Sequence, residues 1–312
     1  MDKEKKKNID KLFVVATFDK KESEKLAVEP YSYWRSVYKA FKKKPSAIFA
    51  VSLLVLMIVF TVFVPIFSPY DIKSVYLDSR LQEPSLQHLF GTNAEGRDMF
   101  TLIWVGARTS MVIALIVTLI NTFLGVIIGG LWGYFKKLDI IMLEVYNFII
   151  NIPALLQYMI LLYVLGSLGS PPEFNLVIAM TITGWSGLAR MIRNQILVFN
   201  NREYNIASRA LGSSAGRIIV NNLLPYILSV IITTVSLSIS GVIRTEVSLA
   251  YFGLGLPVDS ISLGRILRES YNSWLATPYI LIYPAIVVGM ITIVFYLIGL
   301  ALSDALDPRT HR

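Results

Sequence analysis

The chain has 312 residues, of which 54% are hydrophobic and only 16% are charged, and its formal net charge is +8. Soluble domains carry about 25% charged residues, so the composition excludes an ordinary soluble protein and favours one with several membrane spans. The chain has no cysteine, which excludes disulfides and thiolate metal sites. The positive charge follows the loops between apolar runs, so no nucleic-acid partner is expected. The two histidines, His88 and His311, lie too far apart in sequence to form a metal site alone.

The chain begins with a basic segment over residues 1–45. Residues 1–29 are polar and rich in lysine, so we expect them to be loosely ordered. After them, aromatic and apolar side chains share one face of a predicted helix: Trp34, Val37, Tyr38 and Phe41. This pattern predicts a helix along the inner membrane surface, with its lysines near anionic lipid. An ordinary positively charged flank of the first span explains the pattern equally well.

Runs without charge predict six membrane-spanning helices, at roughly 46–67, 106–134, 139–166, 174–197, 223–250 and 279–302. Most of these runs exceed the roughly 20 residues that a helix needs to cross a bilayer. The sequence therefore predicts an all-α, polytopic membrane protein, with an extracellular segment at 68–105 and a core of five spans at 106–303. The first apolar run begins too late, and lacks a small-residue cleavage site, to be a secretory signal.

Lysine and arginine in the loops predict the orientation. Residues 1–45 carry thirteen of them and the 190–220 loop carries five, whereas the 251–278 segment carries two. Because cytoplasmic loops are enriched in Lys and Arg, we expect the 190–220 loop and both termini, including the 304–312 tail, to lie in the cytoplasm. The predicted location is the cell membrane, which the chain crosses several times.

The segment from Gly91 to Asp98, before the second span, has nearly the spacing of a phosphate-binding loop. Arg97 and Asp98 stand where the G-x-x-x-x-G-K-[ST] motif has Lys and Ser or Thr, so the groups that hold phosphate and magnesium are replaced. The segment is also expected on the outer side of the membrane. We therefore exclude nucleotide binding and predict a tight turn, with Asp98 close to the start of a helix.

Two features inside the spans predict how the helices pack. Gly125, Gly129 and Gly133 recur at four-residue spacing in the second span, which allows the close approach of another helix. In the third span Pro153, after Asn151 and Ile152, removes a backbone donor and predicts a kink. Such a kink can shape a cavity. A kink that serves only the packing of the helices explains the proline equally well.

Four ionisable residues are expected inside or at the ends of spans. Asp139 stands near the start of the third span and fits a helix-dipole partner, whereas Glu144 lies deeper. Arg244 and Glu246 come late in the fifth span, and their i,i+2 spacing places them on different faces. Charges at depth usually face a cavity or a partner, so Glu144, Arg244 and Glu246 are candidates for the translocation path. Contact with lipid headgroups explains them nearly as well.

The segment 201–225 between two spans is predicted to form a helix, a turn and a second helix. One side of the first helix gathers Tyr204, Ala207, Ala210 and Leu211. Gly212 can take the left-handed conformation that ends a helix, Ser213 or Ser214 can cap the next one, and Pro225 stands near the start of the fifth span. Such a protruding pair of helices predicts a docking element, although a surface hairpin without a partner would show the same pattern.

This segment resembles the cytoplasmic EAA motif of ABC-importer permeases: E-A-A, three residues, Gly, nine residues, then I-x-L-P. Four positions match in register: Ala207, Gly212, Leu224 and Pro225. Three depart from the motif's Glu, second Ala and Ile: Ile206, Ser208 and Asn222. The peptide-permease version, E-Y-x-x-A-x-R-A-L-G, is matched by Glu203, Tyr204, Ala207, Arg209, Ala210, Leu211 and Gly212.

Further motifs follow in the order of that family. GTD-x-x-GRD is matched by residues 91–98 with Asn93 in place of Asp, and GAR by 106–108. Glu246 with residues 252–255 resembles E…FLGLG, and residues 304–309 read DALDPR. Over roughly residues 30–312, the chain is identified as a member of the C-type permease subunits of oligopeptide and dipeptide ABC importers (the OppC/DppC family). Its lysine-rich N-terminal extension is typical of the Gram-positive OppC/AmiD type.

The resemblance implies a type I ABC-importer permease fold and a non-catalytic subunit that binds no cofactor itself. It implies a pore shared with a homologous B-type permease. It also implies two P-loop ATPases that bind ATP and magnesium and receive the 203–214 helix in a groove. An extracellular peptide-binding protein would deliver the peptide and dock on the loops 68–100 and 251–278.

Other functions remain open at this point. A self-contained secondary transporter would need ion-coupling residues at mid-membrane and usually repeated halves, and neither is evident in the sequence. A channel or structural membrane subunit would use the 203–214 helix as an anchoring surface. Within the family, a permease for dipeptides or nickel chelates is the rival interpretation.

Overall fold

The computed structural model describes residues 33–256 and 260–306. Within these ranges the regular elements are helices, apart from one isolated β-bridge between Thr92 and Asp98. The predicted all-α class is therefore confirmed. The lysine-rich segment before Tyr33 and the end of the DALDPR motif, at 307–309, lie outside the described residues.

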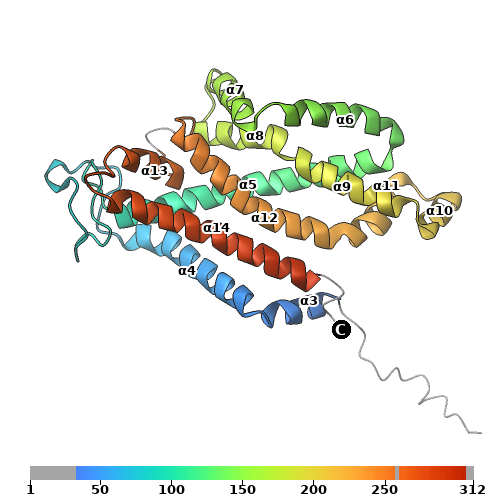
Figure 1. Ribbon diagram of the computed structural model, residues 1–312, viewed down its shortest axis with the longest axis horizontal. Helices are drawn as coiled ribbons and strands as arrows, with labels where there is room; N and C mark the ends of the chain where they lie inside the picture. The colour runs from blue at the N-terminus through green and yellow to red at the C-terminus, as the bar shows by residue number, and fades with distance from the viewer. Residues whose placement is uncertain (1–32, 257–259, 307–312) are drawn as a thin grey trace, which may run out of the picture.

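The long helices of the described residues lie roughly side by side along the long axis of the molecule, whereas α7 turns away from that axis (Figure 1). Their bounds are α3 Tyr33–Lys42, α4 Pro45–Phe67, α5 Met99–Tyr134, α6 Lys136–Asn151, α7 Ala154–Gly166, α8 Pro172–Gly184, α9 Ser186–Asn200, α10 Glu203–Ala210, α11 Ala215–Arg217, α12 Leu224–Tyr251, α13 Leu263–Tyr271 and α14 Tyr279–Leu306. At one end of the bundle the chain forms a loop between α4 and α5 together with α13, and α10 and α11 project from the other end (Figure 1).

Among the described residues, four continuous helices are long and apolar enough to cross a membrane: α4, α5, the run Ala215–Tyr251 that ends in α12, and α14. The bent pair of α6 and α7 makes a fifth candidate. The six predicted spans are thus not six continuous helices. The predicted span 174–197 is divided at Trp185 into α8 and α9, of 13 and 15 residues. At 1.5 Å per residue neither covers a hydrocarbon core of about 30 Å alone.

Pro153 breaks the third predicted span. α6 ends at Asn151 and α7 begins at Ala154, and the two helix axes meet at 92°. Proline lacks the N–H that would continue the helix, and the Gln157 side chain donates instead to the carbonyls of Ile149 and Ile152. The predicted kink is confirmed, and it is a full break rather than a bend.

α5 begins at Met99, seven residues before the predicted start at 106. The reason is local: the Asp98 carboxylate accepts a hydrogen bond from the Thr101 backbone N–H at 2.8 Å and so caps the helix. The sequence did not predict this extension, because the spans were predicted from runs without charged residues and Arg108 interrupts such a run. The predicted position of Asp98 near a helix start is confirmed.

α5 is the central helix, and α9 packs closely along it. The approach depends on the predicted glycine row. A Cβ at Gly129 would lie 2.5 Å from the Ala189 carbonyl oxygen, and one at Gly133 would lie 2.8 Å from Ile196 Cβ. Gly125 faces Leu188 in the same way. The row therefore serves helix packing, as predicted.

α3 packs on the end of α14. Val37 is buried against Ala305 and Leu306, and the Tyr33 hydroxyl donates to the Leu306 carbonyl at 3.1 Å. Lys44, just after α3, forms an ion pair with Asp304. The predicted apolar face is thus divided, because Trp34 and Tyr38 stay exposed. Contact of these two rings with lipid stays a prediction.

Candidate functional site

The segment 201–223 forms a projecting hairpin whose first arm is α10. Gly212 has φ +82°, its N–H bonds to the Arg209 carbonyl, and the Ser213 N–H bonds to the Ser208 carbonyl, each at 3.0 Å. This pair of bonds around a left-handed glycine is the Schellman ending of a helix, so the predicted left-handed conformation of Gly212 at the end of a helix is confirmed. Ser214 precedes α11, but its side chain makes no capping hydrogen bond.

The second arm of the hairpin is continuous with the following span. α11 has three residues and passes through the π-helical stretch Ile218–Leu223 directly into α12. Pro225 stands just after this π-helical stretch and, because proline has no N–H, donates no backbone hydrogen bond to the preceding turn. The predicted second helix is therefore the start of a single helix from Ala215 to Tyr251.

The outer surface of the hairpin consists mostly of apolar and small side chains, with the charged Glu203 at the start of α10. Leu211 is 87% exposed and Tyr204 is 40% exposed. The other exposed members of the predicted coupling set are Glu203, Ala207, Ala210 and Gly212. Single exposed apolar side chains are common, but here they share one short projecting helix. This surface, defined by the six residues just named, is called the hairpin face below.

Three polar side chains hold α10 against the start of α12. Asn205 is fully buried, and its amide donates to the Phe199 carbonyl at 3.0 Å. The Asn222 amide donates to the Asn205 side-chain oxygen at 3.0 Å and to the Ser208 hydroxyl at 3.3 Å. Sequence reasoning missed this cluster. A signal was present, because Ser208 and Asn222 are two of the departures from the general motif, and the structure shows that they contact each other.

Arg209 faces α9 rather than the hairpin face. Its guanidinium donates to the side-chain oxygen of Asn200 at 2.7 Å and to the Asn200 carbonyl at 3.2 Å.

Tyr204 stacks on Tyr226 with ring centroids 5.8 Å apart, next to Pro225. Of the predicted coupling residues, Arg209 and Pro225 therefore belong to the base of the hairpin, and Ser213 is half-buried at its turn.

Replacing Asn222 by leucine should loosen the hairpin. The change keeps a similar volume but leaves the buried Asn205 oxygen without its donor, which costs about 1–3 kcal/mol. We expect backbone amides of 203–212 to exchange with deuterium at least fivefold faster. Asn221→Leu is the matched control, because Asn221 is exposed one position earlier. Equal protection of α10 in Asn222→Leu and the wild type would contradict the anchoring role.

The predicted translocation residues are not brought together. Glu144 is exposed on α6, and Arg244 lines a cavity beside α12. Glu246 is only 1% exposed, on another face of α12. Its carboxylate accepts from the Ser110 hydroxyl at 3.0 Å, and that hydroxyl accepts from the Leu263 N–H at 3.2 Å. Glu246 thus joins α12 to α5 and to the start of α13.

Asp139 connects α6 to two other helices through its side-chain contacts. It lies in the first turn of α6, as expected of a dipole partner, but its carboxylate also pairs with Arg193 of α9. The two bonds from the Arg193 guanidinium measure 2.9 and 2.6 Å, and the Trp132 indole N–H of α5 donates at 2.8 Å. Asp139 therefore ties α6 to both neighbouring helices.

The cavity beside α12 has a volume of about 770 Å³, within the range of ligand pockets. Its walls come from α5, α7, α8, α9 and α12, including the start of α7 just after the break at Pro153. The predicted kink therefore helps to shape a cavity. We call this space the α12 cavity.

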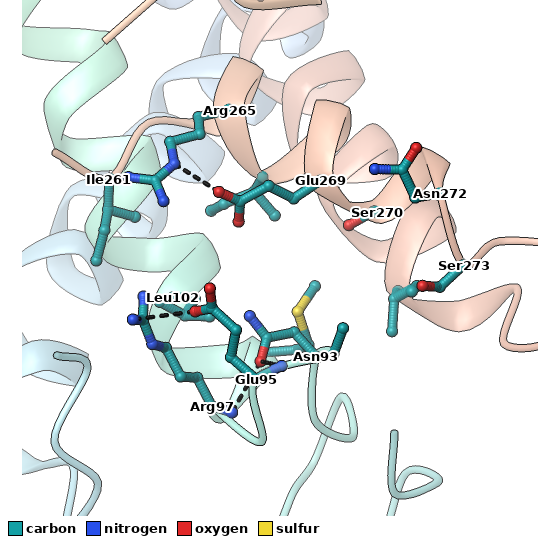
Figure 2. A pocket seen from close by; sticks show the side chains of 14 residues that line it. Asn93, Glu95, Arg97, Leu102, Ile261, Arg265, Glu269, Ser270, Asn272 and Ser273 are labelled. Atoms are coloured by element: carbon teal, nitrogen blue, oxygen red, sulfur yellow. Dashed lines mark hydrogen bonds and ion pairs between the residues drawn. The ribbon is translucent and has the colours of Figure 1, made fainter. Parts of the chain in front are cut away.

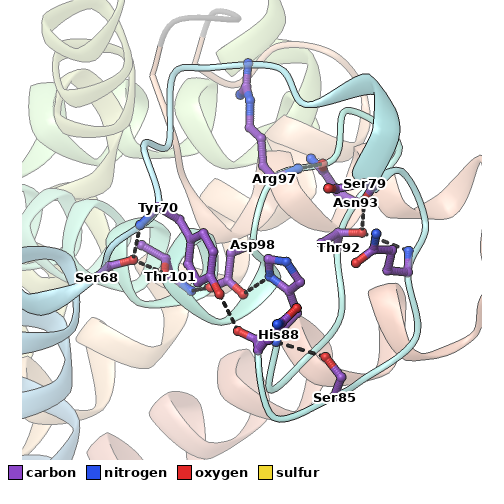
Figure 3. A network of polar contacts seen from close by, with 12 residues as sticks. Ser68, Tyr70, Ser79, Ser85, His88, Thr92, Asn93, Arg97, Asp98 and Thr101 are labelled. Carbon is purple, nitrogen blue, oxygen red and sulfur yellow. Dashed lines mark hydrogen bonds and ion pairs between the residues drawn. The ribbon is translucent and has the colours of Figure 1, made fainter.

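A polar network closes the loop between α4 and α5 at the other end of the bundle (Figure 3). His88 Nδ1 lies 3.0 Å from Asp98, whose other oxygen accepts from the Thr101 hydroxyl at 2.7 Å. Gly96, with φ +78°, lets this turn pass close to Tyr76, since a Cβ there would lie 1.8 Å from the Tyr76 carbonyl oxygen. The predicted tight turn is confirmed.

A small pocket of about 250 Å³ separates this loop from α13 (Figure 2). Two ion pairs line it, Arg97 with Glu95 at 3.0 Å and Arg265 with Glu269 at 2.6 Å. Each charge is neutralised by its neighbour, so the pocket has no net preference for a charged ligand.

Two family matches cover most of the chain. Residues 121–312 match the family described as binding-protein-dependent transport system inner membrane component. Residues 32–84 match the N-terminal TM domain of oligopeptide transport permease C.

Curated relatives match over nearly their full length. The oligopeptide transport system permease protein AmiD of Streptococcus pneumoniae is 40% identical, over 93% of this chain and 94% of AmiD. The permease protein OppC of Bacillus subtilis is 33% identical, over 96% of this chain and 98% of OppC. The dipeptide transport system permease protein DppC of Bacillus subtilis is 32% identical, over 97% and 94% respectively.

A solved structure shares the fold. An inward-facing conformation of the MetNI methionine ABC transporter matches 67% of this chain and 98% of the matched chain, with a TM-score of 0.55. Its sequence identity of 17% limits this likeness to the fold alone.

Proposed function

Since the chain belongs to the binding-protein-dependent transport inner membrane components, as the permease subunit of an ABC peptide importer of the Gram-positive oligopeptide type, we propose how its parts divide the work. It forms the pore with a homologous B-type permease and takes its motion from two P-loop ATPases. Those ATPases bind ATP and magnesium, and this chain supplies no catalytic group and no cofactor.

The hairpin face is the surface that the ATPase receives. What supports this is one observation: an exposed face of mostly small and apolar side chains stands on a base held by buried hydrogen bonds. A transmitter of motion has to stay rigid while its partner changes shape, and that base supplies the rigidity. Glu203, Tyr204, Ala207, Ala210, Leu211 and Gly212 make the contact in this proposal, whereas Arg209, Ser213 and Pro225 hold it in position.

The charge pattern supports an orientation with α10 and both termini in the cytoplasm. The loop 68–98 and α13 then face outward and receive an extracellular peptide-binding protein. α3 and its lysines lie near lipid headgroups in this proposal. Domain bounds of 1–45, 46–67, 68–98, 99–303 and 304–312 are proposed, with the boundary predicted at 105/106 moved because α5 begins at Met99.

The α12 cavity is this subunit's share of the translocation path, with Arg244 on its wall. Glu144, exposed on α6, would contact the second permease in this proposal. Glu246 acts from within the protein, by holding α13 to α5 and α12. Dipeptides are a second candidate substrate, because a dipeptide permease is among the relatives and the binding protein selects the length.

Gentle purification of the tagged chain from its own membrane, followed by mass spectrometry, tests this proposal. We expect a second permease of the same family and two P-loop ATPases to purify with it. ATP-dependent peptide uptake by that complex in proteoliposomes is the second expected result. A chain that purifies alone, or only with copies of itself, would contradict the proposed assembly.

A further inference from the structure

A row of small and hydroxyl-bearing residues runs down the cavity side of α12. These residues are Thr234, Ser238, Gly241, Thr245 and Ser248. Their spacing of three and four residues keeps them on one helical face, over about 20 Å of helix at 1.5 Å per residue. The face is long enough to contact several residues of an extended peptide, which rises about 3.3 Å per residue.

The hydroxyl protons of this row are already used within the protein, and Thr234 donates to the Met191 sulfur of α9 at 4.0 Å. Ser238 donates to the Val235 carbonyl at 2.8 Å, Thr245 to Gly241 at 3.0 Å, and Ser248 to Arg244 at 2.8 Å. Each hydroxyl oxygen keeps acceptor capacity. A wall of weak acceptors suits backbone N–H groups of any peptide, because it does not depend on side-chain identity.

Arg244 differs from the rest of the wall. Of the described residues that line the α12 cavity, it alone carries a charge. No hydrogen bond or ion pair joins its guanidinium to another described residue, although Arg97, Arg193 and Arg265 all have carboxylate partners. An arginine within a membrane span normally has a partner or faces a polar cavity. The planar guanidinium group of arginine binds a carboxylate through two parallel hydrogen bonds.

We propose that Arg244 binds the C-terminal carboxylate of the peptide in the α12 cavity. The inference rests on the proposed role of this cavity in peptide passage and adds which peptide group is recognised. Every unmodified peptide carries this carboxylate whatever its sequence, so one arginine can serve many substrates. Arg244 lies seven residues before the end of α12, near the end where α13 packs. In the proposed orientation it therefore meets the carboxylate on the outer side.

Uptake of two matched peptides by the complete transporter in proteoliposomes tests the proposal. The probes are hexa-alanine with a free carboxylate and hexa-alanine with a C-terminal amide. We expect the wild type to take up the free acid about tenfold faster than the amide. Arg244→Gln should lower uptake of the acid to the rate of the amide and leave the amide unchanged. Arg244→Lys should keep part of the preference, because it keeps the charge but not the fork.

Arg108→Gln is the matched control, since it removes an exposed arginine of α5 that does not line the cavity. We expect it to keep the acid-to-amide ratio of the wild type. Equal loss of both peptides in Arg244→Gln would overturn the inference and assign Arg244 to structure or to the second permease. Unchanged uptake of both would overturn it as well. Failure of the wild type to take up either peptide with ATP would instead contradict the proposed function.

Discussion

Gly212→Arg should abolish ATP-dependent peptide uptake while the protein still reaches the membrane. Gly212 ends α10 at φ +82°, and nothing lies within 4 Å of the position a Cβ would occupy. The arginine would therefore project from the hairpin face into the space of the proposed ATPase groove. A left-handed conformation costs a non-glycine residue about 1–2 kcal/mol, which is too little to unfold the chain. We expect uptake to fall by more than a hundredfold, measured with labelled peptide in whole cells.

Gly169→Arg is the control that distinguishes the conformational cost of an arginine at a left-handed position from its effect on the hairpin face. Gly169 has φ +71° and the same open surroundings, but it lies in the turn between α7 and α8. Because both variants introduce the same charge at a left-handed glycine, we expect Gly169→Arg to keep at least half of the wild-type uptake. If Gly212→Arg transports normally, or if the two variants lose uptake equally, the hairpin face is not the coupling surface.

Gly129→Ala should destabilise the folded subunit strongly for a change of one methyl group. The new Cβ would lie 2.5 Å from the Ala189 carbonyl oxygen and 2.8 Å from its Cα, both backbone atoms of α9. A backbone cannot rotate away as a side chain can, so the two helices have to separate. Overpacking of this kind costs about 1–3 kcal/mol. We expect a lower midpoint of thermal unfolding for the purified protein in detergent.

Gly130→Ala provides the neighbouring control. A Cβ there would lie 3.4 Å from the Ile219 side chain, which is close to ordinary contact. Alanine also favours a helix by about 1 kcal/mol relative to glycine. We expect the midpoint of thermal unfolding to stay the same or rise slightly. A midpoint for Gly129→Ala as high as that of the wild type would show that α5 and α9 can separate without cost.

Features governed by a few consecutive residues could be predicted from the sequence. The left-handed Gly212, the Asp98 cap, the glycine row of α5 and the break at Pro153 all follow from local backbone chemistry. The order of the motifs also predicted the family, because each motif could be recognised without knowing its neighbours in space.

Features that depend on distant residues could not be predicted. The contact of Asn222 with Ser208 crosses a turn, and the contact of Glu246 with Ser110 joins α12 to α5. A carboxylate late in a span looks the same in sequence whether it lines a path or is buried under another helix. The division of α8 from α9 was missed for a related reason, since Trp185 keeps a helical backbone (φ −70°, ψ −23°) and no proline marks the junction.

Because the helix from Ala215 to Tyr251 is continuous, a displacement of one end is transmitted to the other end. Its first residues belong to the hairpin, and its second half carries the hydroxyl row from Thr234 to Ser248 together with Arg244 and Glu246. At 1.5 Å per residue its length is about 55 Å. A tilt of 10° about its midpoint would move each end by roughly 5 Å in opposite directions, by simple geometry on that length. In the proposed transporter, a movement of the hairpin at one end would thus reach the far end of the α12 cavity in a single tilt, as long as the π-helical stretch Ile218–Leu223 between them does not bend.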